Sequence, residues 1–323
     1  MKAIELTPEH PVDEITELAV QAEETGFDAV FAACHYFNRD PFVTLSRIAA
    51  ATDEIELGPA AANPYETHPL KLASQVATVQ EVSDGRAVFG VGPGDRSTLQ
   101  SMGVERDSPL RRVLETFKIA QDLWAGETVD ADGTFTAQDA ALEFPVEGEI
   151  PVYVGAQGPH MLRMSAKHAD GVLYNAAHPR DFAWAEGQIE QGLDERPADR
   201  GDFEFAAYAS VSVAEDEAAA RAAARPPVAF IVGGAAPPVL DRHDIDEAAA
   251  QAVGEAIEAG EFTDAFGQVT EEMIDVFSIA GTPEQVREGV DAVMEYADGF
   301  VAGSPLGPDL EDAIRLAGAA LDC

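Results

Sequence analysis

Short apolar runs alternate along this chain with longer segments in which apolar residues recur at helical spacing. Residues 87 to 91 are small and apolar without alternation, a pattern typical of a parallel strand that is covered on both faces. Strands that alternate with helices predict repeated βαβ units and a parallel sheet. We expect eight strands, near residues 2 to 6, 28 to 33, 55 to 62, 86 to 91, 151 to 155, 171 to 174, 204 to 212 and 298 to 302.

Amphipathic segments fill the spaces between these strands and predict helices. Eight strands interleaved with helices, in a chain of 323 residues, fit a (β/α)8 TIM barrel better than an open doubly wound sheet. We therefore predict one α/β barrel domain over residues 1 to 323. The expected helices span residues 13 to 25, 41 to 51, 69 to 83, 110 to 124, 160 to 169, 179 to 193, 283 to 296 and 310 to 321.

Two regions interrupt the repeat. Residues 125 to 148 are rich in turn-forming residues and predict a hairpin extension. Residues 214 to 280 are too long for one crossover, so we expect extra helices there, with Pro226 to Pro238 as a connecting segment. The apolar stretch from Val228 to Val232 could form an interface between subunits or part of the core.

The charge of the chain is strongly unbalanced. It has 59 acidic and 20 basic residues, a formal net charge of −39, spread through amphipathic segments. Such a field repels nucleic acids and anionic membranes, which excludes them as partners. Because dense carboxylates are tolerated in concentrated salt, we expect a protein of a salt-rich cytoplasm. No basic segment with a long apolar run precedes the first strand, which also favours a cytoplasmic location.

No residue pattern predicts a metal site. Cys34 and Cys323 lie far apart in the chain and match no metal-ligand spacing. The seven histidines are scattered and form no His-Glu-x-x-His motif. We therefore expect neither a zinc site nor a disulfide framework.

A glycine-rich segment follows the strand at 86 to 91. The strand stops at Gly92, Pro93 and Gly94, where glycine lets the backbone approach a planar ligand. Asp95 comes next, at the carboxyl end of the strand, where α/β barrels place their chemistry. A plain turn with a solvated aspartate remains the alternative.

Glu5 and His35 also lie at predicted strand ends. A buried carboxylate, at Glu5 or Asp95, can have its pKa raised into the range of a general acid. The alternatives are that Glu5 is an ordinary polar residue on the barrel rim and that His35 is a structural imidazole.

Two further segments have the composition of a ligand site. Gly155, Ala156, Gln157 and Gly158 join a strand to a helix, so their backbone N–H groups can receive a phosphate. The strand at 55 to 62 ends in three alanines, which leave space for a flat ring where bulky side chains would normally fill a barrel. An ordinary turn and a tightly packed strand are the alternatives.

These motifs, in their order and spacing, resemble the bacterial luciferase-like superfamily over nearly the whole chain. Within it the chain resembles the coenzyme F420-dependent methylenetetrahydromethanopterin reductases. The motifs that carry the resemblance are Ile4-Glu5, His35-Tyr36, residues 57 to 65, Ser83-x-Gly85-Arg86, residues 92 to 95, residues 155 to 159, residues 281 to 284 and residues 301 to 308.

The resemblance implies roles for individual residues. It implies that Asp95 and Glu5 lie near a pterin, that His35 lies beside the deazaflavin, and that a non-prolyl cis peptide at Ala60–Ala61 supports the ring. Relatives carry aspartate where this chain has Cys34, which argues against a charged proton donor at His35. The implied cofactor contacts are Ala60, Ala61, Asn63, Gly92, Pro93, Gly94, Ala156, Gln157, Gly158 and Asn175.

The activity implied by the resemblance is transfer of a hydride from reduced coenzyme F420 to methylenetetrahydromethanopterin or methylenetetrahydrofolate. A protonated carboxyl group at Asp95 or Glu5 would donate to the departing pterin nitrogen while the other carboxylate stabilises the developing cation. The family forms dimers and larger assemblies, so we expect a homo-dimer or homo-tetramer. Three alternatives remain: an FMN-dependent monooxygenase, an F420-linked alcohol or sugar-phosphate dehydrogenase, and a non-catalytic barrel subunit.

Overall fold

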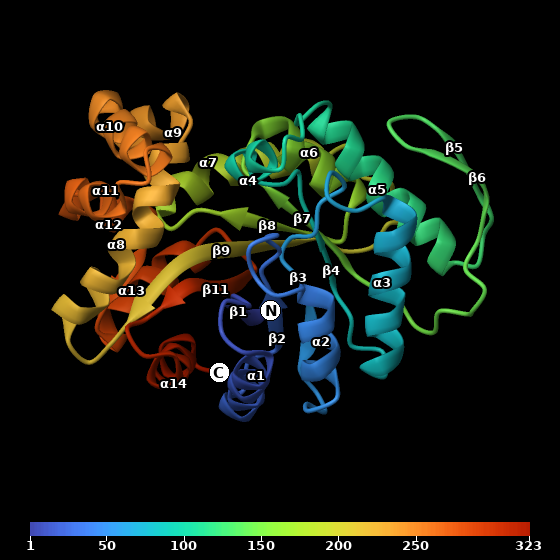
Figure 1. Cartoon of the computed structure of the whole chain (residues 1–323), viewed down its shortest axis with the longest axis horizontal. Helices are drawn as coiled ribbons and strands as arrows, with labels where there is room; N and C mark the ends of the chain where they lie inside the picture. Colours follow the sequence, from blue (N-terminus) through green and yellow to red (C-terminus); the bar gives the residue numbers. More distant parts are fainter.

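Eight parallel strands surround the centre of the molecule in the computed structural model, which describes residues 1–323 (Figure 1). Their order is β3-β2-β1-β11-β9-β8-β7-β4. The TIM barrel predicted from the sequence is therefore confirmed, and each of its eight strands lies within a few residues of the predicted range. The strands are β1 (Lys2–Leu6), β2 (Ala29–Ala32), β3 (Glu56–Pro59), β4 (Phe89–Val91), β7 (Val152–Ala156), β8 (Gly171–Asn175), β9 (Glu204–Val213) and β11 (Gly299–Leu306).

The ring closes where β3 and the segment after it meet β4. Leu57 forms a parallel bridge with Ala87, and Ala62 forms one with Val91. The N–H of Ala62 donates to the carbonyl oxygen of Gly90 at 3.0 Å. These bonds bring the chain after β3, including Ala62, to the carboxyl end of β4.

Two glycines allow this close approach. A Cβ atom on Gly58 would lie 2.0 Å from the carbonyl oxygen of Val88, and one on Gly90 would lie 2.0 Å from that of Pro59. No side chain fits at that distance, so both positions require glycine for the barrel to close.

Helices cover the outside of the barrel and pack against it through their apolar faces. The largest buried cluster, of 61 residues, lies between the strands and these helices, and a smaller one fills the barrel interior around Phe31 and Val301. The surrounding helices are α1 (Val12–Thr25), α2 (Pro41–Ala49), α3 (Pro69–Val82), α4 (Arg96–Ser101), α5 (Pro109–Trp124), α6 (Pro159–His168), α7 (Pro179–Leu193), α13 (Pro283–Met294) and α14 (Leu310–Leu321).

Two elements that the sequence did not indicate are short. Helix α4 has six residues and follows the glycine-rich loop directly. Strand β10 (Ile279–Gly281) has three residues and pairs in parallel with the end of β9. Neither is long enough to show a hydrophobic period in the sequence.

An antiparallel hairpin of β5 (Val129–Asp132) and β6 (Thr136–Ala140) lies inside the segment expected to form one. It projects from the barrel beside α5 (Figure 1). Several helices between β9 and β10 gather at the opposite side of the molecule (Figure 1). They are α8 (Glu217–Gly234), α9 (Pro237–Arg242), α10 (Glu247–Glu258), α11 (Phe262–Gln268) and α12 (Glu271–Phe277).

The connecting segment predicted at Pro226 to Pro238 is wrong. Helix α8 continues through Pro226 and Pro227, and only residues 235 and 236 separate it from α9. Buried Ala224 and Val228 on either side of the prolines hold this helix against its neighbours, and this packing outweighs the unfavourable propensity of proline.

The apolar stretch beginning at Val228 belongs in part to the core, which is one of the two roles considered for it. Val228, Ala229 and Val232 are buried in a separate cluster of 15 residues within the insertion. Phe230 points outward with 52% of its surface exposed, and it lies near Phe262 and Phe266 in an exposed aromatic cluster.

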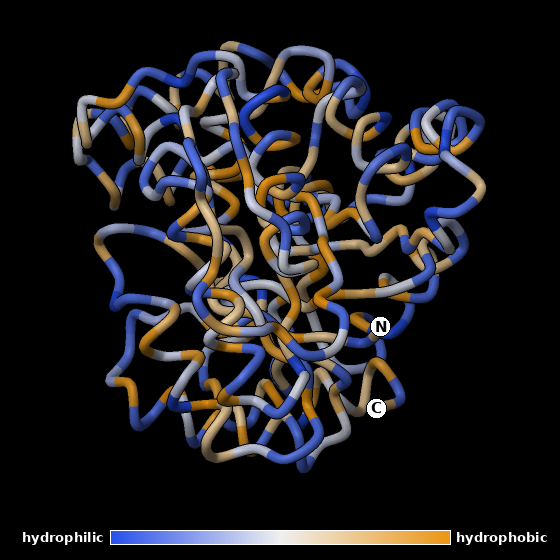
Figure 2. The backbone as a smooth tube through the Cα atoms, turned by 90° about the vertical axis from the view of Figure 1, so that its right-hand side faces the viewer, coloured by the Kyte–Doolittle hydropathy of each residue, from blue (hydrophilic) through white to orange (hydrophobic).

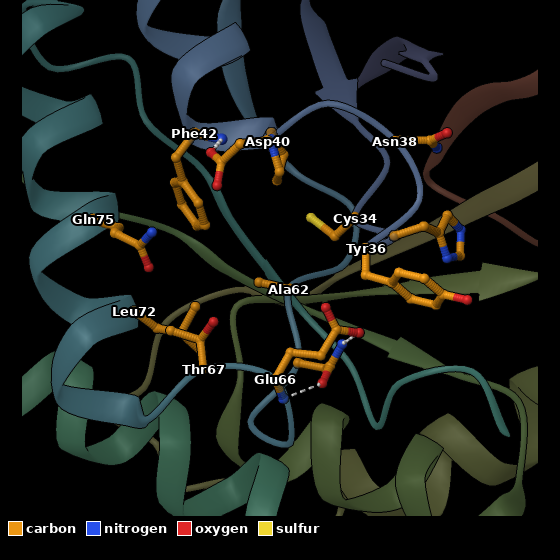
Figure 3. Close-up of a pocket in the computed structure, with 13 residues that line it drawn as sticks. Cys34, Tyr36, Asn38, Asp40, Phe42, Ala62, Glu66, Thr67, Leu72 and Gln75 are labelled. Atoms are coloured by element: carbon orange, nitrogen blue, oxygen red, sulfur yellow. Dashed lines mark hydrogen bonds between the residues drawn. The ribbon is translucent and has the colours of Figure 1, made fainter. Parts of the chain in front are cut away.

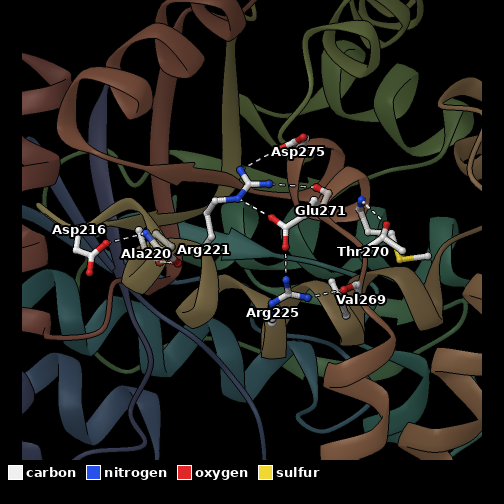
Figure 4. Close-up of polar contacts among 11 residues, drawn as sticks. Asp216, Ala220, Arg221, Arg225, Val269, Thr270, Glu271 and Asp275 are labelled. Atoms are coloured by element: carbon white, nitrogen blue, oxygen red, sulfur yellow. Dashed lines mark hydrogen bonds and ion pairs between the residues drawn. The ribbon is translucent and has the colours of Figure 1, made fainter.

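Ion pairs join the first and last helices of this insertion (Figure 4). The Arg221 guanidinium donates to Glu271 Oε2 at 2.8 Å and lies 2.8 Å from Asp275 Oδ1. Arg225, one turn further along α8, pairs with the same Glu271 carboxylate. The two arginines therefore fix α12 against α8.

Hydrophilic residues recur along the outer helices and loops of the molecule (Figure 2). This distribution agrees with the spread of acidic residues along the sequence. No helix combines the length and the apolar character that crossing a membrane requires.

Candidate active site

Glu5 is a buried carboxylate near the carboxyl end of β1. It is 3% exposed, and its Oε1 accepts a hydrogen bond from the Thr7 hydroxyl at 2.7 Å. Its Oε2 accepts one from the backbone N–H of Ser304 on β11 at 3.1 Å. Tyr208 on β9 faces the same carboxyl group. Three neighbouring strands thus fix the position of one acidic side chain.

Burial controls the protonation of Glu5. Loss of water contact raises the pKa of its carboxyl group above the ordinary value, although hydrogen bonds from Thr7, Ser304 and Tyr208 act in the opposite direction. The raised pKa favours a protonated carboxyl group, which is the state that a general acid requires.

Asp95 behaves differently, and the expectation that its pKa is raised overall is wrong. Its side chain caps α4, where Oδ2 accepts from the Ser97 hydroxyl at 2.6 Å and from the Thr98 N–H at 2.7 Å. Partial burial acts to raise the pKa of Asp95, but the bonds from Ser97 and Thr98 outweigh it, so the pKa lies below the ordinary value. Asp95 is therefore a fixed negative charge on the exposed rim.

His35 lies on the same side of the site as Asp95. Burial lowers the pKa of His35, although the negative charges of Asp95 and Glu66 act to raise it. A neutral imidazole is therefore favoured, in agreement with the argument from Cys34. The hydrogen bonds of Glu5 are with Thr7, Ser304 and Tyr208, whereas Asp95 acts on His35 through its charge and forms no hydrogen bond with it.

A cavity of about 200 Å³ opens beside His35, between the loops after β2 and β3 (Figure 3). Its lining includes Cys34, whose thiol pKa is raised by burial, so that the thiol stays protonated. Three lining side chains have a buried polar atom without a hydrogen-bond partner: His35 Nδ1, Asn38 Nδ2 and Gln75 Oε1. Buried polar groups in proteins are normally paired, so these atoms indicate room for polar groups of a ligand or for water.

Small residues from three segments meet at the barrel mouth. A Cβ atom on Gly92 would lie 3.2 Å from Cβ of Ala61, and one on Gly155 would lie 3.6 Å from it. The Ala60–Ala61 peptide is cis, as the resemblance implied. Ala61, Gly92 and Gly155 therefore pack closely together, with Gly92 buried and Ala61 and Gly155 partly exposed.

The loop after β3 is held to the loop after β4. Asn63 is 5% exposed, and its Oδ1 accepts from the N–H of Glu66 at 3.0 Å while its Nδ2 donates to Glu66 Oε1 at 2.8 Å. Gly94 has a φ of +69°, and a Cβ atom there would lie 3.2 Å from Cγ of Asn63. The predicted contacts Asn63, Pro93 and Gly94 therefore lie together, with Asn63 supporting both loops.

The loop after β7 carries the predicted phosphate contacts. Gly158 is the N-cap of α6 and supplies no side-chain cap, so backbone N–H groups of the first turn remain available to an anion. Ala156 is buried, whereas Gln157 and Gly158 are exposed. Asn175 ends β8, the next strand, and is half-buried opposite Tyr208 of β9.

Sequence reasoning did not identify Tyr208, Ser304 or Glu66. Tyr208 is the one tyrosine of its strand and is flanked by alanines, and Glu66 directly follows the Asn-Pro-Tyr motif, so both had a weak signal in the sequence. Ser304 acts through its backbone N–H, which side-chain identity does not reveal. No group of three or more metal-ligating side chains is placed to hold a metal ion.

This barrel mouth, with small residues at its centre and carboxylates on its rim, defines a class of protein. The chain belongs to the family described as luciferase-like monooxygenase, whose model matches residues 2–300.

Within that class the chain is 42% identical over 321 residues to the 5,10-methylenetetrahydromethanopterin reductase of Archaeoglobus fulgidus, covering 98% of this chain and 96% of the relative. It is 41% identical over 317 residues to the enzyme of the same name from Methanolobus tindarius, covering 98% and 97%. The solved structure of the coenzyme F420-dependent tetrahydromethanopterin reductase from Methanopyrus kandleri superposes with a TM-score of 0.91 at 37% identity, covering 98% of this chain and 96% of that chain.

Proposed function

We propose that this protein is a coenzyme F420-dependent oxidoreductase that reduces a methylene-bridged tetrahydropterin to the methyl form. The observation that carries the proposal is the buried carboxyl group of Glu5, held by Thr7 and the Ser304 N–H at the carboxyl end of β1 in a barrel of this family. Identity of 42% over nearly the full length of a reductase supports methylenetetrahydromethanopterin as the substrate.

The residues present fit the deazaflavin cofactor. Ala61, Gly92 and Gly155 form the cradle that its ring would contact, and the uncapped α6 N-terminus at Gly158 would hold its phosphate. His35, with an unpaired Nδ1, lies at the edge of the site. When bound in its reduced form, the cofactor supplies the hydride.

Glu5 has the position and protonation to act on the substrate. Its carboxyl proton is transferred to the pterin nitrogen that departs when the five-membered ring opens, leaving an electrophilic methylene carbon. The fixed negative charge of Asp95 stabilises the cation that develops on the opened ring. Thr7 and the Ser304 N–H hold Glu5 in place.

The test is steady-state absorbance with purified protein in concentrated KCl. Reduced F420 is supplied with methylenetetrahydromethanopterin or with methylenetetrahydrofolate, and the appearance of oxidised cofactor is recorded. We expect turnover with the methanopterin derivative. Absence of turnover with both pterins, while fluorescence titration shows that F420 binds, would contradict the proposal.

We further infer that the protein is adapted to concentrated salt, because the carboxylates of a chain with 59 acidic and 20 basic residues repel one another unless they are screened. Lowering KCl from about 1 M to about 0.1 M lengthens the screening distance from about 3 Å to about 10 Å. We expect the melting temperature to fall by about 5 °C or more, which corresponds to about 2 kcal/mol. Thermal melting followed by circular dichroism, with sucrose as an uncharged control, checks this; a melting temperature independent of KCl would contradict it.

We also infer a cytoplasmic homo-oligomer. The exposed aromatic cluster of Phe230, Phe262 and Phe266 supports contact between subunits, since exposed rings of this size are rarely grouped on a monomer. Light scattering coupled to size exclusion should give a dimer or tetramer, and Phe230→Ser should shift it toward the monomer. A monomeric wild type would contradict this inference.

A further inference from the structure

Most arginines of this acidic chain pair with a carboxylate, as at Arg47, Arg221 and Arg315. Arg96 and Arg106 form no such ion pair. Arg96 directly follows the glycine-rich loop after β4, and Arg106 donates to the carbonyl oxygen of Pro93 in the same loop. Arg96 is exposed and Arg106 is half-buried. Other arginines without an ion pair, such as Arg86, Arg163 and Arg196, donate to backbone carbonyl or side-chain amide oxygens instead. Arg96 donates to no protein group and Arg106 donates only through Nε, so both can bind another anion.

The loop after β4 fixes the pair. Arg96 is the first residue of α4, directly after Asp95. Arg106 precedes α5, and its Nε donates to the carbonyl oxygen of Pro93 at 2.9 Å, which holds the guanidinium against the glycine-rich loop. The remaining N–H groups of Arg106 have no hydrogen-bond partner in the protein and can bind an oxyanion.

Neighbouring charges do not neutralise this pair. Burial lowers the pKa of Arg106, and the positive charge of Arg96 lowers it further, whereas Tyr65 and Asp95 act in the opposite direction. The Oδ2 atom of Asp95 is engaged by Ser97 and Thr98 in capping α4. Asp95 therefore offsets the two charges only in part.

We propose that Arg96 and Arg106 together bind an anionic group, a phosphate or carboxylate, on the tail of one of the two reactants. This inference rests on the proposed function, because the deazaflavin cofactor and the pterin carriers both have anionic tails. Such molecules are repelled by a protein of net charge −39, so a local cationic pair lowers the cost of their approach. Strand β4 also pairs in parallel with β7, so the loops that carry Arg96 and Gly158 follow neighbouring strands.

Single variants Arg96→Gln and Arg106→Gln test the proposal, with Arg315→Gln as the control. Arg315 on α14 is exposed and its substitution changes the net charge equally, away from the mouth. KM and kcat are measured for each reactant with its full tail. One arm replaces F420 by the deazaflavin fragment without its phosphate-bearing tail, and the other replaces the carrier by a methylenetetrahydropterin without an anionic tail.

For one full-length reactant, we expect KM to rise about 10-fold in both rim variants, the loss typical of one hydrogen bond to a charged group, with kcat changed less than about twofold. KM for its tail-less form should be the same in wild type and variants, and inorganic phosphate should compete with that reactant less strongly in the variants. If removing the tail of one reactant abolishes the KM difference between wild type and variants, that reactant is the one whose tail the two arginines bind.

Unchanged KM for both full-length reactants would overturn the proposal. Equal increases for tailed and tail-less forms, or an equal increase in Arg315→Gln, would also overturn it, because the effect would then be general electrostatics. If the wild type turns over neither pterin, calorimetric binding of F420, of its tail-less fragment and of inorganic phosphate to the same variants still tests the anion site. Loss of anion-dependent affinity in the rim variants would support the site even though the proposed reaction had failed.

Discussion

Replacing Glu5 by glutamine is expected to lower kcat by about 10²- to 10⁴-fold, the usual contribution of a positioned general acid. Glutamine has nearly the same size and can still accept a hydrogen bond from the Ser304 N–H, but it has no acidic proton to donate. KM for F420 should change little, because the bonds of Glu5 are with Thr7 and Ser304 and not with Ala61, Gly92 or Gly155. Stopped-flow absorbance of F420 oxidation gives the rate.

The pH dependence separates this role from a structural one. Because burial raises the pKa of Glu5, the protonated acid persists to higher pH than that of an exposed glutamate, and kcat should fall as pH rises through this pKa. This fall of kcat with rising pH should be absent in Glu5→Gln. Asp95→Asn is the matched control, since its pKa is lowered and its effect on kcat should be smaller. A larger loss in Asp95→Asn than in Glu5→Gln would reverse the two roles.

The same substitution should stabilise the fold. A carboxyl whose pKa is higher in the folded state than in the unfolded chain binds more protons when folded, so its contribution to stability is present at low pH and is lost as pH rises through the folded pKa. At neutral pH this loss of stability lowers the free energy of unfolding of the wild type, and Glu5→Gln removes it. We expect a melting temperature equal to or above that of the wild type, which also shows that lost activity does not come from unfolding.

Replacing Gly90 by alanine should destabilise the protein by about 4 kcal/mol or prevent folding, which places it among the most damaging single substitutions. The new Cβ would lie 2.0 Å from the Pro59 carbonyl oxygen, so β3 and β4 would have to separate and lose the hydrogen bonds that close the barrel. Urea unfolding in concentrated KCl, followed by circular dichroism, measures the change.

Gly187→Ala is the control for Gly90→Ala. Gly187 lies within α7, and no atom lies within 4 Å of a Cβ added there. Alanine should therefore stabilise the helix by up to about 1 kcal/mol. If Gly90→Ala were as stable as the wild type, the two strands could not be in the close contact described above.

Most of the fold could be predicted from the sequence, because each barrel strand is an apolar run and each outer helix has an apolar face. The exceptions have physical reasons. Strand β10 has only three residues, and α8 continues through Pro226 and Pro227 because tertiary packing outweighs propensity. Neither the length of β10 nor the packing around α8 appears as a periodic pattern.

The residue types of the site could be predicted from the sequence, but the charge states of its carboxyl groups could be predicted less well. Glu5, Asp95 and His35 lie at the carboxyl end of the barrel, as expected from their positions after strands. The opposite pKa shifts of Glu5 and Asp95 could not be predicted, because they depend on burial, which dominates at Glu5, and on the hydrogen bonds from Ser97 and Thr98, which dominate at Asp95. That arrangement exists only in the folded chain.

The insertion between β9 and β10 has its own buried cluster of 15 residues, separate from the 61-residue cluster of the barrel. Two such cores in one chain can differ in the free energy at which they open. Amide hydrogen exchange should therefore show a cooperative unit in α8 to α12 that exchanges before the barrel strands do. Mutations that weaken this unit would leave the barrel folded. The shape of the insertion can therefore change during evolution with little effect on the barrel that carries the active site.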